Sequence, residues 1–143
     1  MFVNITSEKI KIEEAYKYCQ SEACGAQIIF LGNVRNLNEG KMVKGVFYDG
    51  NINMAKKVLL QITEEARTKW GDELIIFIEH RIGYLVLTDT SLIIGVATPH
   101  RQSAYEVSRF LIEEIKKRLP IWKEEHYVDS DSKWLDGISL NES

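Results

Sequence analysis

Cysteine and proline are scarce in this sequence of 143 residues, which has two of each. Cys19 and Cys24 fit neither a C-x-x-C redox pair nor a zinc site with a second pair of ligands downstream, so both are predicted to be structural. The glycines form none of the patterns G-x-G-x-x-G, G-x-x-x-x-G-K-S/T and G-x-S-x-G. The sequence therefore signals no dinucleotide site, no nucleotide P-loop and no serine-hydrolase nucleophile.

Long apolar runs are also absent. None approaches the roughly 20 residues that a membrane-spanning helix needs, and residues 1–13 contain no basic run followed by an apolar stretch. We expect no membrane contact and a cytoplasmic location. Because the formal net charge is -3, the average surface repels a phosphate backbone, and no nucleic-acid partner is expected. Local basic patches in such a protein mark sites for small anions.

Hydrophobic residues make up 45% of the chain and nothing repeats at a fixed period, so residues 1–143 are predicted to form one domain. Apolar and β-branched runs predict strands over residues 2–5, 27–31, 43–48, 74–78, 84–87, 92–97 and 121–128. Helical spacing predicts helices over residues 9–21, 54–70 and 99–118. Since helices and strands alternate only in part, we expect an α/β or α+β fold with a mixed sheet.

The two longer helices have predicted buried stripes. In the second helix the stripe is Met54, Val58, Ile62, Ala66 and Trp70, and in the last helix it is Ala104, Val107, Leu111, Ile115 and Leu119. Asn51 or Asn53 is suited to cap the second helix, while Pro99 stands in the first turn of the last helix and Pro120 ends it. The polar stretch over residues 33–41 predicts an exposed, mobile loop.

The segment Thr98-Pro99-His100-Arg101 lies between a predicted buried strand and the start of the last helix. A helix start presents free N–H groups and the positive end of the helix dipole. Arg101 can bind an oxyanion with two parallel hydrogen bonds, and His100 can exchange a proton near neutral pH. The alternative is that both are ordinary exposed residues, but cations at a helix start do not add stability.

A second cluster of cations ends the last helix at Lys116, Lys117 and Arg118 and continues at Lys123. Basic residues in a last helical turn complement the negative end of the dipole, so the first three are explained by helix stability alone. Lys123 lies beyond Pro120, where a lysine partly shielded from water has a lowered pKa and can act as an acid or base. The acidic neighbours Glu124 and Glu125 oppose that lowering.

Arg35, with Asn33 two residues before it, follows the predicted strand over residues 27–31 at the edge of the loop. Strand ends beside loops often carry binding residues, although an isolated arginine there is also a common surface charge. His80 and Arg81 end another strand and form a possible second site, for which we favour a structural or interface role.

Helix length separates the two basic groups. The step from His100 to Lys116 is 16 residues (116 − 100), or roughly 24 Å at the helical rise of about 1.5 Å per residue. One small ligand cannot contact both within a subunit. Either there are two anion sites, or a symmetric dimer brings the start of this helix in one subunit to its end in the other, and we prefer the dimer.

Together the segments resemble the large, catalytic subunit family of molybdopterin synthase. The matching residues, in order, are Gly25-Ala26, Phe30-x-Gly32-x-Val34-Arg35-Asn36, Met54-Ala55, His80-Arg81-Ile82-Gly83-x-Leu85, Pro99-His100-Arg101-x-x-Ala104-Tyr105, Lys116, and Pro120-Ile121-Trp122-Lys123-x-Glu125. They extend over most of the chain, from about Gly25 to Trp134. Each is weak alone, but the ordered set is specific.

The resemblance implies an α/β hammerhead fold and a homodimer of large subunits within a heterotetramer. At each end, a small ubiquitin-like sulfur-carrier subunit would insert its C-terminal glycine thiocarboxylate into the active site. The substrate would be cyclic pyranopterin monophosphate, which two sulfur transfers convert to the dithiolene of molybdopterin, without a metal or other cofactor. By position, Lys116 and Lys123 resemble the catalytic lysines and also bind substrate. The other implied substrate ligands are Asn33, Arg35, His100, Arg101 and Glu125.

Three positions depart from the family pattern. Asp49-Gly50-Asn51 stands where a glutamate followed by an aromatic residue is common, Thr88 replaces a frequent turn glycine, and Glu124 replaces a frequent basic residue beside Lys123. Two rival functions stay open: a noncatalytic subunit that binds partners, and an unrelated enzyme acting on a small phosphorylated metabolite. The presence of both lysines and of the His-Arg pair speaks against the first.

Overall fold

The computed structural model describes residues 1–129 and 133–134. Its elements in chain order are β1 (Phe2–Thr6), α1 (Ile12–Tyr18), β2 (Ala26–Asn33), β3 (Leu37–Asn38), β4 (Lys41–Gly50), α2 (Ile52–Trp70), β5 (Ile75–Arg81), β6 (Gly83–Val86), β7 (Thr90–Thr98), α3 (Arg101–Arg118), β8 (Ile121–Tyr127) and β9 (Lys133–Trp134). All seven predicted strands and all three predicted helices are present. The prediction of a single domain over residues 1–143 stays a prediction, because its last residues lie outside the described part.

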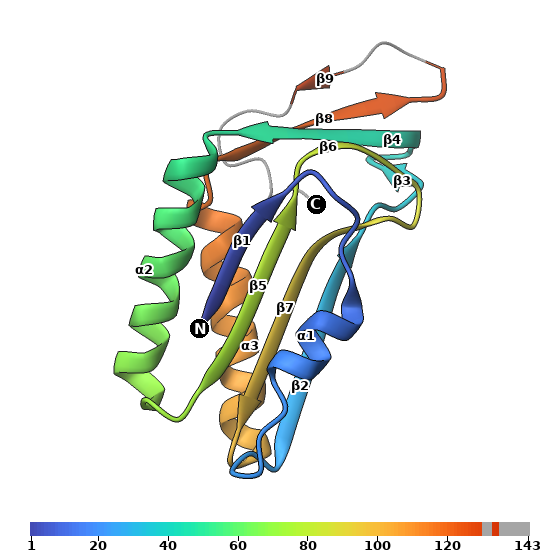
Figure 1. Cartoon of the computed structure of the whole chain (residues 1–143). Coiled ribbons are helices and arrows are strands. Elements are labelled where there is room, and N and C mark those ends of the chain that lie inside the picture. The colour runs from blue at the N-terminus through green and yellow to red at the C-terminus, as the bar shows by residue number, and fades with distance from the viewer. Residues whose placement is uncertain (130–132, 135–143) are drawn as a thin grey trace.

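The strands form two sheets, shown in Figure 1. The first, which we call the handle sheet, has the order β1-β5-β7-β2; β1 runs parallel to β5, and the other pairs are antiparallel. The second, the head sheet, has the order β3-β4-β8-β9 with β6 added to β4, and it lies across one end of the handle sheet. The mixed α/β class is therefore confirmed, whereas the division into two sheets was not predicted.

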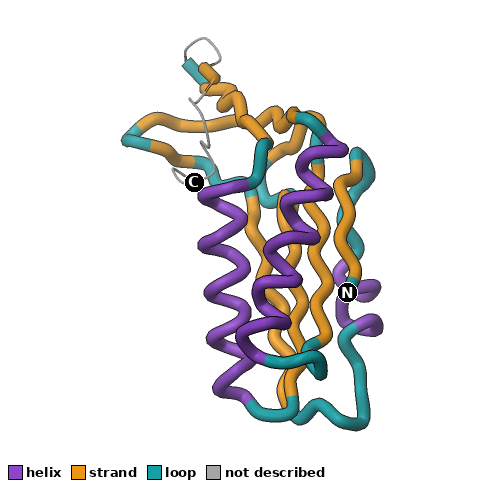
Figure 2. Tube along the Cα trace, turned by 90° about the vertical axis from the view of Figure 1, so that its left-hand side faces the viewer, coloured by secondary structure: helices purple, strands orange, loops and turns teal. Residues whose placement is uncertain are grey.

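The handle sheet is covered on both faces. Helices α2 and α3 pack side by side against one face, and α1 lies on the other (Figures 1 and 2). Because side chains alternate between the two faces of a strand, β5 contributes to the hydrophobic core on each face of the sheet. Ile76 and Ile78 face the long helices. Phe77, between them, packs near Ala15 and Cys19 of α1. The long helices run the length of the handle sheet, and the C-terminal turn of α3 lies next to the head sheet (Figure 1).

The predicted stripe of α3 is confirmed, because all five of its residues are buried. The helix starts at Arg101 rather than Pro99, so Pro99 lies outside it and His100 is the N-cap. In α2 the predicted stripe is partly wrong: Met54 is 53% exposed, and the buried face contains Ala55, Leu59, Ile62, Thr63 and Ala66. Four residues advance a helix by more than one turn, so a stripe spaced by four drifts off the face that alternating steps of three and four follow.

The departure at residues 49–51 has a structural explanation. A Cβ atom on Gly50 would lie 2.4 Å from the carbonyl oxygen of Pro120, so only glycine fits where β4 approaches the start of β8. Asn51, one of the two predicted candidates, caps α2, and its side-chain oxygen accepts a hydrogen bond of 3.0 Å from the backbone N–H of Met54. These residues thus fix the strand-to-helix connection.

The loop over residues 33–41 is mostly exposed, as predicted, but contains the short strand β3, which pairs with β4 in a hairpin. Backbone hydrogen bonds also attach it to the turn between β6 and β7: Val34 donates to Asp89 at 2.9 Å, and Thr88 donates to Val34 at 2.8 Å. The direction of the chain at Arg35 therefore depends on that turn. The mobility of the loop stays a prediction.

Thr88 adopts φ 72°, the left-handed region in which a Cβ atom is unfavourable and a β-branched residue is rare. A glycine, which the family pattern noted above has at this position, would adopt this conformation without that strain. We predict that Thr88→Gly raises the free energy of unfolding by about 1 kcal/mol, the relief of strain less the greater chain entropy of glycine in the unfolded state. Urea unfolding midpoints test this, with Thr88→Ala as the control that retains the Cβ atom and should gain little. A glycine variant no more stable than Thr88 would contradict the prediction.

Cys19 and Cys24 are both free thiols. Cys19 is buried against Gly95 in the smaller core, and burial raises the pKa of its thiol to about 11, which keeps it protonated and unreactive. That is a structural role for Cys19, as predicted. In the described part of the chain, no helix has the length and apolar character needed to cross a membrane.

Candidate active site

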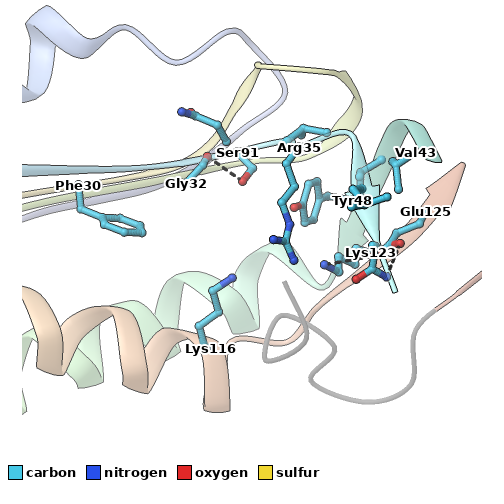
Figure 3. Close-up of a pocket in the computed structure, with 14 residues that line it drawn as sticks. Phe30, Gly32, Arg35, Val43, Tyr48, Ser91, Lys116, Lys123 and Glu125 are labelled. Atoms are coloured by element: carbon cyan, nitrogen blue, oxygen red, sulfur yellow. Dashed lines mark hydrogen bonds and ion pairs between the residues drawn. The ribbon is translucent and has the colours of Figure 1, made fainter. Parts of the chain in front are cut away.

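A cavity of about 320 Å³ opens where the head sheet meets the end of the handle sheet (Figure 3). This volume is within the range of small-molecule sites. Its walls come from β2, the following loop, β3, β4, β7, the end of α3 and β8. The lining residues are Phe30, Gly32, Asn33, Val34, Arg35, Leu37, Asn38, Val43, Val46, Tyr48, Ser91, Lys116, Lys123 and Glu125. Five of the seven predicted site residues are thus brought together: Asn33, Arg35, Lys116, Lys123 and Glu125.

Lys123 and Glu125 form a buried ion pair in the floor of the cavity. The Nζ atom of Lys123 lies 3.4 Å from Oε1 of Glu125, and both side chains are 4% exposed. Because side chains alternate along β8, Lys123, Glu125 and Tyr127 share the buried face. Glu124 points to the opposite face, where it bonds the ring of His126 at 2.6 Å. Glu124 is therefore not a close electrostatic neighbour of Lys123.

Lys116 is the only residue of the basic helix end that enters the cavity. Arg118 bonds Glu65 of α2 at 2.7 Å and Glu114 at 3.2 Å, and Lys117 pairs with Glu114 at 3.7 Å. These two cations stabilise the helix end and its packing. Burial, with a further contribution from the ammonium group of Lys123, lowers the pKa of Lys116 to about 8.

The cavity has more positive than negative charge. Arg35 and Lys116 point toward each other across it (Figure 3), Lys123 is the third cation, and Glu125 is the one lining carboxylate. No described residue forms an ion pair with Arg35. Asn33 is held by Thr90, whose hydroxyl donates to its side-chain oxygen at 2.8 Å. Such a cavity can bind an anion and offset negative charge that develops during a reaction.

Tyr48 lines the cavity, and His80 is buried beside it. Burial is the main cause that raises the pKa of Tyr48, and Glu125 raises it further, while a hydrogen bond with Ser91 lowers it. The ring of His80 meets the Tyr48 ring edge-on at 5.1 Å. Burial is the main cause that lowers the pKa of His80 to about 4; the hydrogen bond with the Arg81 carbonyl opposes it and Lys116 adds to it, so the imidazole is neutral at neutral pH. Arg81 pairs with Asp89 at 3.5 Å; the structural or interface role that we favoured for His80 and Arg81 stays a prediction.

His100 and Arg101 lie at the opposite end of α3 from Lys116, and both are exposed. Figure 1 shows this end at the tip of the handle, away from the head sheet. The separation inferred from the sequence is therefore present, and one subunit does not bring these two residues into the cavity. Among the described residues, no group of three or more histidine, cysteine, aspartate or glutamate side chains could hold a metal ion.

Comparison with known proteins agrees with this geometry. The family model described as "MoaE protein" matches residues 5–118. The molybdopterin synthase catalytic subunit of Synechococcus elongatus is 38% identical over 138 residues, which cover 96% of this chain and 84% of that protein. The corresponding subunit of Halalkalibacterium halodurans is 40% identical over 127 residues, 89% of this chain and 81% of that protein. The chain belongs to the molybdopterin synthase catalytic subunit family.

A solved structure supports the same conclusion. The crystal structure of molybdopterin synthase from Staphylococcus aureus matches with a TM-score of 0.88 at 38% sequence identity, over 94% of this chain and 96% of that chain. The resemblance found in the sequence is thereby confirmed, as is the function predicted from it, that of a molybdopterin synthase catalytic subunit. Family membership also removes the rival reading of an unrelated enzyme acting on a phosphorylated metabolite.

Sequence reasoning missed Tyr48, Ser91 and Asn38 as lining residues of this family member's cavity. Tyr48 belongs to the run that predicted a strand over residues 43–48, and Ser91 directly precedes the strand predicted over residues 92–97. Nothing in such a run distinguishes a side chain facing a cavity from one facing the core. The alternation of Lys123, Glu125 and Tyr127 was a usable signal, because it places these polar groups on one face of a strand.

Proposed function

We propose that the cavity at the sheet junction is the active site, in which sulfur passes from a carrier thiocarboxylate to cyclic pyranopterin monophosphate. The carrier is a small ubiquitin-like subunit, and its C-terminal glycine bears the thiocarboxylate. The observation that carries the proposal is the juxtaposition of Arg35, Lys116 and Lys123 in one cavity of a molybdopterin synthase family member. Both reactants are anionic, so a site with excess positive charge suits them.

The two lysines suit different steps. In the first, the thiocarboxylate sulfur forms a C–S bond to the precursor as a C–O bond breaks, and an ammonium group can protonate the departing oxygen. In the second, water cleaves the acyl–sulfur bond, leaving sulfur on the pterin and a carboxylate on the carrier. A neutral amine accepts the proton of that water. Two rounds produce the dithiolene. Lys116, whose pKa is about 8, is suited to the neutral role and Lys123, paired with Glu125, to the charged one.

We further propose that His100 and Arg101 complete the site across a symmetric dimer. Their exposure at the far end of α3 makes them available to a second subunit, and a two-fold axis can bring that end to the partner's cavity. With a carrier subunit at each end the assembly is a heterotetramer. We place it in the cytoplasm, a reducing compartment that suits two free cysteines.

The test of the proposed function is direct. The purified protein is mixed with thiocarboxylated carrier and cyclic pyranopterin monophosphate, and dithiolene product is detected after oxidation to its fluorescent derivative. Product is expected. A folded protein that binds the carrier but forms no product would support the noncatalytic subunit, and failure to bind the carrier would contradict the proposed partner.

The pH dependence follows from Lys116. If its neutral amine accepts a proton, kcat should rise about tenfold per pH unit up to the pKa of about 8 and level off above it, because the neutral fraction is only about a tenth at pH 7. Lys123→Met removes the neighbouring charge and should move the Lys116 inflection, followed by NMR of ¹³C-labelled lysine, to higher pH. A profile that is flat between pH 6 and 9 would exclude this role for Lys116.

A further inference from the structure

The buried carboxylate of Glu125 accepts two side-chain hydrogen bonds in addition to its ion pair with Lys123. Oε2 accepts a hydrogen bond of 2.8 Å from the side-chain amide of Asn38 and one of 2.7 Å from the hydroxyl of Tyr127, leaving Oε1 for Lys123 at 3.4 Å. Only the amide nitrogen of Asn38 suits this position, since its oxygen would face another acceptor. We propose that Asn38 and Tyr127 are positioning residues that orient Lys123 through Glu125.

Backbone pairing anchors both donors to the same strand. Asn38 in β3 pairs with Lys41 at the start of β4, and Tyr127 at the end of β8 pairs with Val43 of β4. The ammonium of Lys41 also lies 5.6 Å from the centroid of the Tyr127 ring, but the backbone pairing positions Tyr127 without this contact. Backbone pairing to β4 therefore holds both donors where they bond the same carboxylate oxygen, Oε2 of Glu125.

An orienting role is required by the energetics of burial. Removing two charges from water costs more than their attraction returns unless the remaining hydrogen-bonding positions are also satisfied. Asn38 and Tyr127 satisfy Oε2, so Oε1 faces Lys123. Without them Glu125 can rotate toward other donors, which weakens the ion pair that helps to orient the ammonium group of Lys123 in the cavity.

The inference rests on the proposed function only in the part that assigns turnover to Lys123. Asn38→Ala and Tyr127→Phe each remove one donor and leave the ion-paired residues in place. Each should lower kcat about tenfold, the scale of a lost hydrogen bond to a charged group, with KM for the pterin precursor changed less than about twofold. Lys41→Met is the matched control: it removes the contact on the ring of Tyr127 but no hydrogen bond to Glu125, and should retain full activity.

A second readout does not depend on activity. The rate of Lys123 acetylation by an amine-reactive reagent, followed by mass spectrometry, should rise at least severalfold in Asn38→Ala and Tyr127→Phe and stay unchanged in Lys41→Met. Unfolding midpoints confirm that each variant is folded; Asn38 is in the exposed hairpin, so its replacement leaves the core intact. Unchanged protection of Lys123 in both folded variants would overturn the positioning role, as would a loss confined to KM. If the native protein forms no product, the proposed function fails while the acetylation rates still decide this inference.

Discussion

Lys116→Ala and Lys123→Ala are each expected to lower kcat for dithiolene formation by about 10²- to 10⁴-fold, the usual contribution of a general acid or base. The two variants should differ in stability. Lys123→Ala leaves Glu125 buried without its cation, and breaking a buried pair in this way costs about 3 kcal/mol or more. Lys116→Ala removes a cation whose charged form is already disfavoured by burial and by Lys123, so its free energy of unfolding should fall less than that of Lys123→Ala.

The neighbour of Lys116 supplies the control. Lys117 is in the same helical turn but pairs with Glu114 on the helix surface, so Lys117→Ala should retain full turnover. Single-turnover sulfur transfer and urea unfolding, measured on all three variants, separate loss of chemistry from loss of fold. Turnover within tenfold of the native rate in Lys116→Ala or Lys123→Ala would remove that lysine from the mechanism.

Much of the fold could be predicted because its signals are local. The stripe of α3 and the apolar run of β7 report burial directly, and Asn51 identifies a helix start. The division into two sheets depends on close approaches between segments distant in the sequence, such as Gly50 against Pro120. No periodicity reports such contacts. The start of α3 was misjudged by two residues, because Pro99 suits a first helical turn but its carbonyl instead accepts a hydrogen bond from the distant backbone N–H of Gly25.

Site residues could be predicted from the sequence only where a charged residue stands at a position that helix or strand stability does not explain. Lys123 was recognisable because it follows Pro120, beyond the helix whose dipole accounts for Lys117 and Arg118. Burial lowers the pKa of Lys116 to about 8, with a further contribution from Lys123; the sequence did not indicate this, because burial beside a second cation cannot be read from sequence neighbours. Asn38 gave no signal at all, since its function depends on the carboxylate of Glu125, 87 positions away.

Mixed dimers provide the second large expected effect. Arg101→Ala and Lys116→Ala subunits should each form inactive homodimers if Arg101 binds substrate in the partner's cavity. A heterodimer of the two, purified through different affinity tags, places both defects in one site and leaves the other intact. Its turnover per dimer is therefore expected to recover to about half that of the native dimer.

The control heterodimer combines Lys116→Ala with Lys123→Ala. Both residues belong to the same cavity of one subunit, so each site keeps one defect and no activity should return. Recovery in the first heterodimer but not the second would require that α3 contributes its two ends to two different sites. No recovery in either, or full activity of Arg101→Ala alone, would mean that each cavity works without the partner's helix start. The anion site at His100 and Arg101 would then be separate from the sulfur-transfer site.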